Sequence, residues 1–71
     1  MEKKDYVELN SFLKAIAVAP TGGQAKNIIR SGLVNVNGEK ELRNKRKLRE
    51  DDRVGISGKE YRVTSNFIFK N

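Results

Sequence analysis

Apolar residues near the start of the chain recur at the spacing of a short α-helix. They lie three or four positions apart, so that their side chains share one stripe of the helix surface: Leu9, Phe12, Leu13 and Ile16. Pro20 cannot extend a helical hydrogen-bond ladder, and it biases the residue before it toward an extended backbone. The pattern therefore predicts a first helix that ends before Pro20.

A second helix is predicted to start at Thr21. Thr21 and Gln24 have the spacing of a capping box, in which the Thr21 hydroxyl accepts from the amide of residue 24 and the Gln24 side chain reaches back to the amide of residue 21. The apolar face that follows consists of Ala25, Ile28 and Ile29. Gly32 can adopt the left-handed conformation that commonly closes a helix, so we expect the second helix to end there.

The rest of the chain has the pattern of short strands. Residues 33–36 are rich in valine and precede Asn37-Gly38, a pair that tolerates the positive φ angles of a type I′ hairpin turn. Apolar and polar residues alternate on both sides of a second short turn, with strands expected at 53–56 and 60–64 around 57–59. The terminal segments 6–8 and 67–69 are candidates for additional edge strands.

Composition removes most enzyme chemistries. The 71 residues include no Cys and no His, which excludes disulfides, thiol nucleophiles, imidazole bases and the usual zinc ligands. The carboxylates Glu39, Glu41, Glu50, Asp51 and Asp52 fall in predicted turns, where solvation explains them, with no partner base and no sign of a pocket. We therefore expect one small domain, over residues 1–71, that is not an enzyme and has no cofactor or small-molecule substrate.

The expected location follows from what the chain lacks. No apolar stretch resembles a secretory signal, and none approaches the roughly 20 residues that span a bilayer. The absence of cysteine is compatible with the reducing cytosol. These features predict a cytoplasmic protein without membrane association.

Positive charge is concentrated in the middle of the chain. The net charge is +6, and the segment 43–49 holds five basic residues, no acid, and Leu48, which we expect to anchor the segment to the core. Clustered cations raise the local potential and attract polyanions, of which nucleic acid is the commonest partner of a small basic protein. The charge pattern therefore predicts a binding face more than a general solubility device.

The order of these elements resembles the S4 RNA-binding domain. The matching segments are 12–14, 21–26, 29–38 and 51–54, within a core of about residues 8–57. The segment Gly22-Gly23-Gln24-Ala25-Lys26, together with 43–48, is most similar to the small stand-alone bacterial S4-like proteins of the YaaA and YbcJ type.

The resemblance implies a fold and a function. The fold is α+β, with two short helices packed on a small antiparallel sheet. The function is non-catalytic binding of structured RNA, with ribosomal RNA, transfer RNA, the ribosome or a ribosome assembly intermediate as candidate partners. We expect such a protein to act as a monomer.

Three groups of residues are candidates for RNA contact. The first is the start of the second helix, where unpaired amides and the positive dipole end suit a phosphate: Thr21, Gly22, Gly23 and Gln24. The second comprises cations on the helices: Lys14, placed by the family resemblance, and Lys26 and Arg30, which share one face of the second helix. The third is the basic segment, with Arg43, Asn44, Lys45, Arg46, Lys47 and Arg49.

Two other classes of function are compatible with the residues. Two short helices joined by a turn resemble a DNA-binding helix-turn-helix, although the start of the second helix offers mainly Gln24 for reading bases. The basic face could also dock on an acidic protein partner or on anionic lipid. The few aromatic residues fall at core or strand positions, so a base-stacking platform is not indicated.

Overall fold

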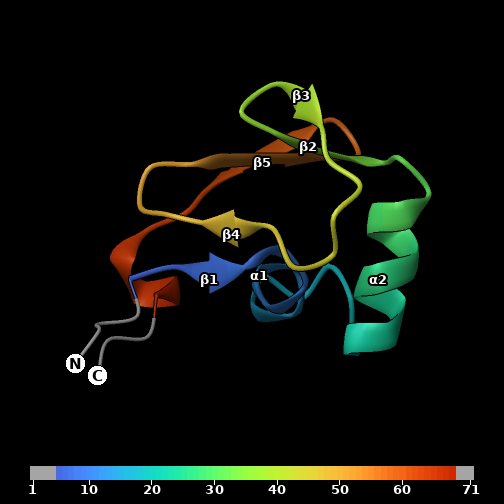
Figure 1. Ribbon diagram of the computed structural model, residues 1–71, viewed down its shortest axis with the longest axis horizontal. Coiled ribbons are helices and arrows are strands. Elements are labelled where there is room, and N and C mark those ends of the chain that lie inside the picture. Colours follow the sequence, from blue (N-terminus) through green and yellow to red (C-terminus); the bar gives the residue numbers. More distant parts are fainter. Residues whose placement is uncertain (1–4, 69–71) are drawn as a thin grey trace.

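The computed structural model describes residues 5–68, which form two short α-helices and a set of short antiparallel strands (Figure 1). In chain order the elements are β1 (Val7–Glu8), α1 (Leu9–Ala15), α2 (Gly22–Arg30), β2 (Val34–Val36), β3 (Glu39–Lys40), β4 (Lys47–Leu48), β5 (Arg53–Ile56), β6 (Lys59–Arg62) and the 3₁₀ helix η1 (Ser65–Phe67). The predicted α+β class, with two helices packed on small antiparallel sheets, is confirmed.

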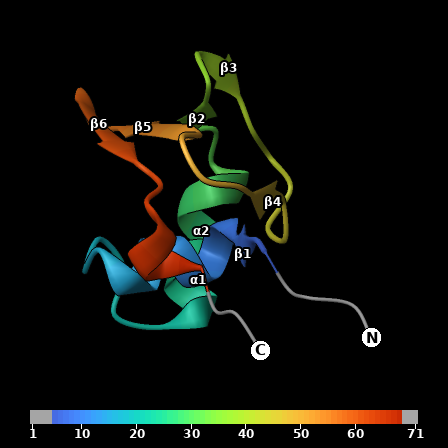
Figure 2. The same ribbon diagram turned by 90° about the vertical axis from the view of Figure 1, so that its left-hand side faces the viewer.

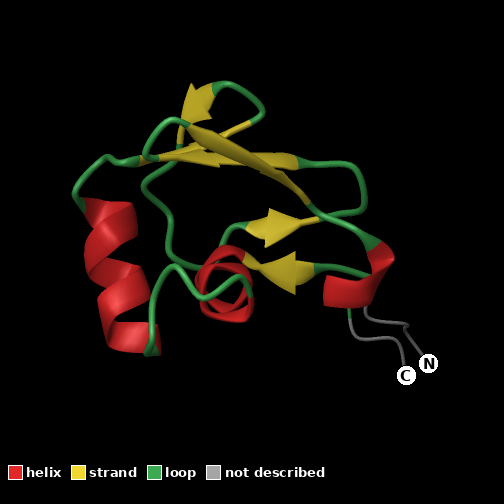
Figure 3. Cartoon of the chain, turned by 180° about the vertical axis from the view of Figure 1, so that it is seen from behind, coloured by secondary structure: helices red, strands yellow, loops and turns green. Residues whose placement is uncertain are grey.

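The strands form two sheets, and the larger one covers the helices. The four-stranded sheet has the order β3-β2-β5-β6, and β1 pairs separately with β4. Seen from behind, the four-stranded sheet makes one layer and the helices the other, with β4 between them and β1 level with α1 (Figure 3). The core between the layers includes Phe12, Leu13 and Ile29 from the helices and Val34 and Val54 from the sheet, all fully buried.

The local signals at the helix ends are confirmed except for one half of the capping box: within residues 5–68, the Gln24 side chain makes no hydrogen bond back to the Thr21 amide. The Thr21 hydroxyl caps α2 by accepting a hydrogen bond of 3.1 Å from the amide of Gln24. Gly32, just past the end of α2, has a φ of 85°, the left-handed conformation expected of it. Ala17 also has a positive φ, 63°, and it turns the chain away from α1 before Pro20 is reached.

Both predicted hairpins are present. Asn37 and Gly38 have φ angles of 53° and 86°, as a type I′ turn requires. In the second hairpin the turn is Ser57-Gly58 alone, with φ angles of 53° and 78°. Lys59, predicted to lie in that turn, pairs with Ile56 as the first residue of β6, because a two-residue turn matches the twist of the strands better.

The predicted terminal strands are half correct. Residues 7 and 8 do form a strand, but it pairs with β4 instead of extending the larger sheet. Phe67 belongs to η1 and not to a strand: its ring packs edge-on against Phe12, with 4.9 Å between the ring centroids. That prediction was wrong because core contact, not strand pairing, determines the position of Phe67. Phe69, predicted to lie in the same strand, is outside the described residues.

Candidate nucleic-acid interface

Residues 43–49, which we call the basic loop, are fixed across the start of α1 by their backbone. The carbonyls of Asn44 and Arg46 accept hydrogen bonds from the amides of Asn10 and Leu9, at 3.1 and 2.8 Å. The residue before α1, Glu8, makes no side-chain cap, so the loop satisfies amides that would otherwise lack a partner. The loop carbonyls therefore point toward the helix.

The basic loop is also held by its one apolar residue. Leu48 is fully buried, and it lies opposite Val7 where β4 pairs with β1. Its predicted role as an anchor is thus confirmed. Because side chains alternate along a strand, its neighbour Lys47 is turned out to solvent.

Four cations of the basic loop surround one open hollow. The hollow has a volume of about 380 Å³ and is lined by Arg43, Lys45, Arg46 and Lys47. Cations that converge on one concave surface focus their field on a ligand there. Four of the five cations of the basic loop therefore lie close together, around this hollow.

Glu41 pairs with two of these four cations and lowers the net positive charge around the hollow. Its side chain is buried, and it forms ion pairs with Arg43 at 2.9 Å and with Arg46 at 2.8 Å. The hydrogen bonds from the Arg43 side chain, assisted by those from Arg46 and the Arg43 amide, outweigh burial and lower the pKa of Glu41 from 4.5 to about 2. The same pairing raises the pKa of Arg43. The prediction that Glu41 is a solvated turn residue was therefore wrong.

The last cation of the loop lies apart from the hollow. Arg49 forms an ion pair with Asp5, and its guanidinium carbon is 5.8 Å from the centre of the Tyr6 ring. Lys47 also lies over that ring, with its amine 5.0 Å from the centroid. This cluster has no signal in the sequence, because about forty positions separate its two halves in the chain and no local pattern links them.

The start of α2 has free space around its glycines. An added Cβ at Gly22 would meet no heavy atom within 4 Å, and one at Gly23 would meet only the Thr21 hydroxyl oxygen, at 3.9 Å. The amides of both glycines precede the first intrahelical bond, which Ala25 donates to the Thr21 carbonyl. Packing within the described residues therefore gives no reason for glycine at either position.

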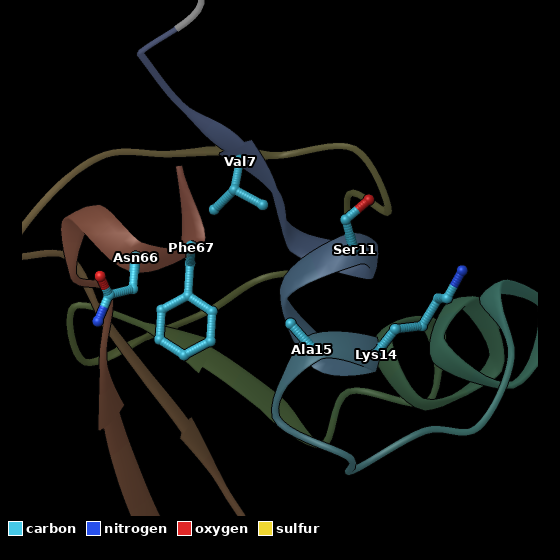
Figure 4. A pocket seen from close by; sticks show the side chains of 6 residues that line it. All are labelled: Val7, Ser11, Lys14, Ala15, Asn66 and Phe67. Atoms are coloured by element: carbon cyan, nitrogen blue, oxygen red, sulfur yellow. The ribbon is translucent and has the colours of Figure 1, made fainter. Parts of the chain in front are cut away.

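The cations on the helices lie outside the hollow. Lys14, Lys26 and Arg30 are all exposed. Lys14 borders a second hollow, between α1 and η1, and its side chain extends away from Phe67 (Figure 4). Within residues 5–68, no hydrogen bond or ion pair links these three side chains, or the start of α2, to the basic loop.

The candidate residues thus lie in separate regions of the molecule. In Figures 1 and 2 the basic loop, drawn in yellow, passes beside the start of α1, while α2 starts below it, at the end of the helix far from the sheet. Asn44 is partly buried, and its side-chain oxygen is enclosed without a hydrogen-bond partner. Asn44 is therefore a loop residue packed against the fold, and its backbone carbonyl accepts a hydrogen bond from the Asn10 amide of α1.

The fold and this surface define a small basic α+β module that presents four cations of the basic loop around one hollow. A model of the S4 domain family matches residues 2–64, and the chain therefore belongs to the S4 domain family. S4 domains are in general non-catalytic RNA-binding modules. The narrower similarity to the stand-alone YaaA and YbcJ type stays a prediction.

A search for relatives and the character of the helices add two findings. A search of individually curated proteins found no match. Neither helix of residues 5–68 has the length and apolar character needed to cross a membrane.

Proposed function

We propose that this S4 domain binds a structured RNA, ribosomal or transfer RNA or an RNA of a ribosome-associated particle, and catalyses no reaction on it. The contacts are made to phosphates, by the basic loop and by the start of α2. The proposal includes action as a monomer in the bacterial cytoplasm.

The observation that carries the proposal is the hollow of the basic loop. Four cationic side chains line it, and the backbone behind them is fixed by α1 and by the buried Leu48. Cations carried on a fixed backbone favour a polyanion whose phosphates are themselves fixed, as they are in folded RNA. Arginine can donate two parallel hydrogen bonds to one phosphate, and the lysines add mobile charge around it.

The start of α2 supports the proposal independently. Exposed amides at a helix start bind phosphate oxygens, and glycine permits a close approach of the ligand backbone. Gly22 and Gly23 have open space where side chains could be. Each glycine in the first turn of a helix lowers its stability by up to about 1 kcal/mol relative to alanine.

The test is a charge reversal that leaves the fold intact. Lys45 and Lys47 are exposed and make no ion pair within residues 5–68, whereas Arg46 is paired with a buried carboxylate and its replacement would also disturb folding. We therefore expect Lys45→Glu with Lys47→Glu to weaken binding to a labelled RNA hairpin at least about tenfold at about 0.1 M salt.

The matched control makes the same change of net charge outside the basic loop. Lys40→Glu with Lys59→Glu alters two exposed lysines of the four-stranded sheet. The control should retain most of the affinity, measured by fluorescence anisotropy in the same buffer. Equal losses in the two double variants would show that only overall charge matters, and they would contradict the assignment of the site.

Salt dependence measures how many phosphates are contacted. Each contact contributes about −0.7 to −0.9 to the slope of log K against log salt. Four contacts would therefore cost roughly 50- to 150-fold in affinity between about 50 and about 200 mM salt. A slope near zero would contradict a phosphate-based site.

A further inference from the structure

Glu41 is the buried charged residue of the described chain, and its place in the fold explains why it is buried. The Asn37-Gly38 turn sets Val36 opposite Glu39, and the amide of Glu41 donates to the carbonyl of Val34 at 2.9 Å. Glu41 therefore lies beside a core valine, with only 7% of its surface exposed. A carboxylate in such a place needs several donors, because burial otherwise favours its neutral form.

The donors come from two arginines of the basic loop. One carboxylate oxygen accepts from the Arg43 amide at 3.0 Å and from Arg43 Nε at 2.9 Å. The other accepts from Arg43 Nη2 at 3.2 Å and from Arg46 Nη1 at 2.8 Å. Each oxygen therefore has two donors, and the carboxylate is fully satisfied.

This arrangement holds two like charges side by side. Without Glu41, the guanidinium groups of Arg43 and Arg46 would repel each other and sample many rotamers. With it, both groups contact the same oxygen atom. Arg43 uses two of its side-chain N–H groups on Glu41, which leaves the rest of its donors, and most of those of Arg46, for a ligand in the hollow that both residues line.

We infer that Glu41 is a positioning residue of the RNA site, whose carboxylate holds Arg43 and Arg46 in the arrangement that receives an RNA phosphate. The inference rests on the proposed function and deepens it. Glu41 contacts the two arginines and not the RNA. Its effect is to order two flexible side chains before the RNA arrives, so that less freedom is lost on binding.

The sign of one substitution separates positioning from simple neutralisation. Glu41→Gln removes a negative charge beside the site, which by charge alone would strengthen binding to a polyanion. Positioning predicts the opposite: the substituted amide keeps one acceptor oxygen, but it turns an N–H donor toward the donors of Arg43 and loses the charge that holds both guanidinium groups, so that affinity falls roughly tenfold. The matched control is Glu39→Gln, which makes the same charge change at an exposed residue of the same hairpin.

The assay is anisotropy with the labelled RNA hairpin, repeated over a range of salt, with circular dichroism to confirm folding. We expect Glu39→Gln to bind as tightly as the parent or slightly better, and Glu41→Gln to bind more weakly with a shallower salt slope, because fewer phosphates are engaged. Binding by Glu41→Gln that equals or exceeds that of Glu39→Gln would overturn the inference. Weaker binding with an unchanged slope and a partly unfolded protein would also overturn it, in favour of a purely structural role.

A measurement on the parent protein covers the case in which Glu41→Gln does not fold. The Arg43 Nε–H should give a sharp NMR signal protected from exchange with water, both in the free protein and in the RNA complex. A signal broadened by exchange in the free protein would contradict the ordered arrangement. If the parent does not bind structured RNA at all, the proposed function fails; if it binds and only the Glu41 predictions fail, the proposed function stands.

Discussion

Replacing Gly22 and Gly23 with alanine would separate the stability of α2 from the function of its start. The two residues follow the cap Thr21 directly and are the first of the helix. Neither is among the residues with positive φ, and the space around both would accept a methyl group without a close contact. Neither backbone conformation nor packing therefore requires glycine at these two positions.

The expected effect on stability follows from helix propensity. Glycine in a helix costs up to about 1 kcal/mol relative to alanine, because it loses more backbone freedom on folding. Each substitution should therefore raise the free energy of unfolding by about 0.5 to 1 kcal/mol. Urea denaturation followed by circular dichroism would measure this gain.

The expected effect on RNA binding has the opposite sign. A methyl group at either position would keep a phosphate away from the amides at the start of α2. A hydrogen bond to a charged group contributes about 1.5 to 3 kcal/mol, so the loss of one should weaken binding by roughly tenfold or more. The protein would become more stable and less active at the same time.

A control in the same helix shows whether helix propensity alone affects binding. Asn27→Ala, at an exposed position of α2, should raise stability slightly and leave RNA affinity unchanged. If the two glycine variants are stabilised and still bind RNA as tightly as the parent, the start of α2 is not a phosphate site. If they are destabilised, the account of the space around the glycines is wrong.

Two further predictions concern the elements that hold the basic loop. Because folding lowers the pKa of Glu41 from 4.5 to about 2, its contribution to the free energy of unfolding, about 3 kcal/mol, is present above about pH 5 and is lost as the pH falls toward 2. Acid titrations of stability should therefore be flatter for Glu41→Gln than for the parent; equal slopes would contradict the ion-pair account. Leu48→Ala should lower the free energy of unfolding by about 2 to 5 kcal/mol, since the side chain is fully buried, and a loss below about 1 kcal/mol in urea would show that it is no anchor.

The parts of the fold that the sequence predicts well are those encoded within a few residues. The cap at Thr21, the left-handed Gly32 and the Asn37-Gly38 turn each depend on one or two side chains and their own backbone angles. Such signals depend on local backbone geometry, and they agree with the final fold. The resemblance of their order to the S4 domain is confirmed by the family match.

The environment of the basic loop was predicted only in part. The charges and the buried Leu48 could be predicted from composition and pattern, but the counter-charge on Glu41 was missed. A signal was available: a two-residue turn at Asn37-Gly38 fixes the register of the hairpin, and that register carries Glu41 to the side of the buried Val34. The same register also sets Glu39 opposite the buried Val36, and Glu39 is exposed, so the register alone does not distinguish the two carboxylates.

Long-range contacts could not be predicted from local patterns. The pairing of β1 with β4 and the ion pair between Asp5 and Arg49 join segments about forty residues apart in the sequence. Phe67 likewise takes its position from Phe12 and not from strand propensity. In each case the deciding contact joins residues that are far apart in the sequence.

The most direct test of the central claim is a competition between a structured RNA and duplex DNA for the parent protein at equal salt. A site that receives phosphates in the geometry of folded RNA should release a labelled RNA hairpin to unlabelled RNA at far lower concentration than to duplex DNA of equal length. Equal or stronger competition by the DNA would contradict the account. A pull-down of bound partners with and without ribonuclease would show whether an acidic protein, and not RNA, occupies the basic loop: partners retained after RNA digestion would favour the protein.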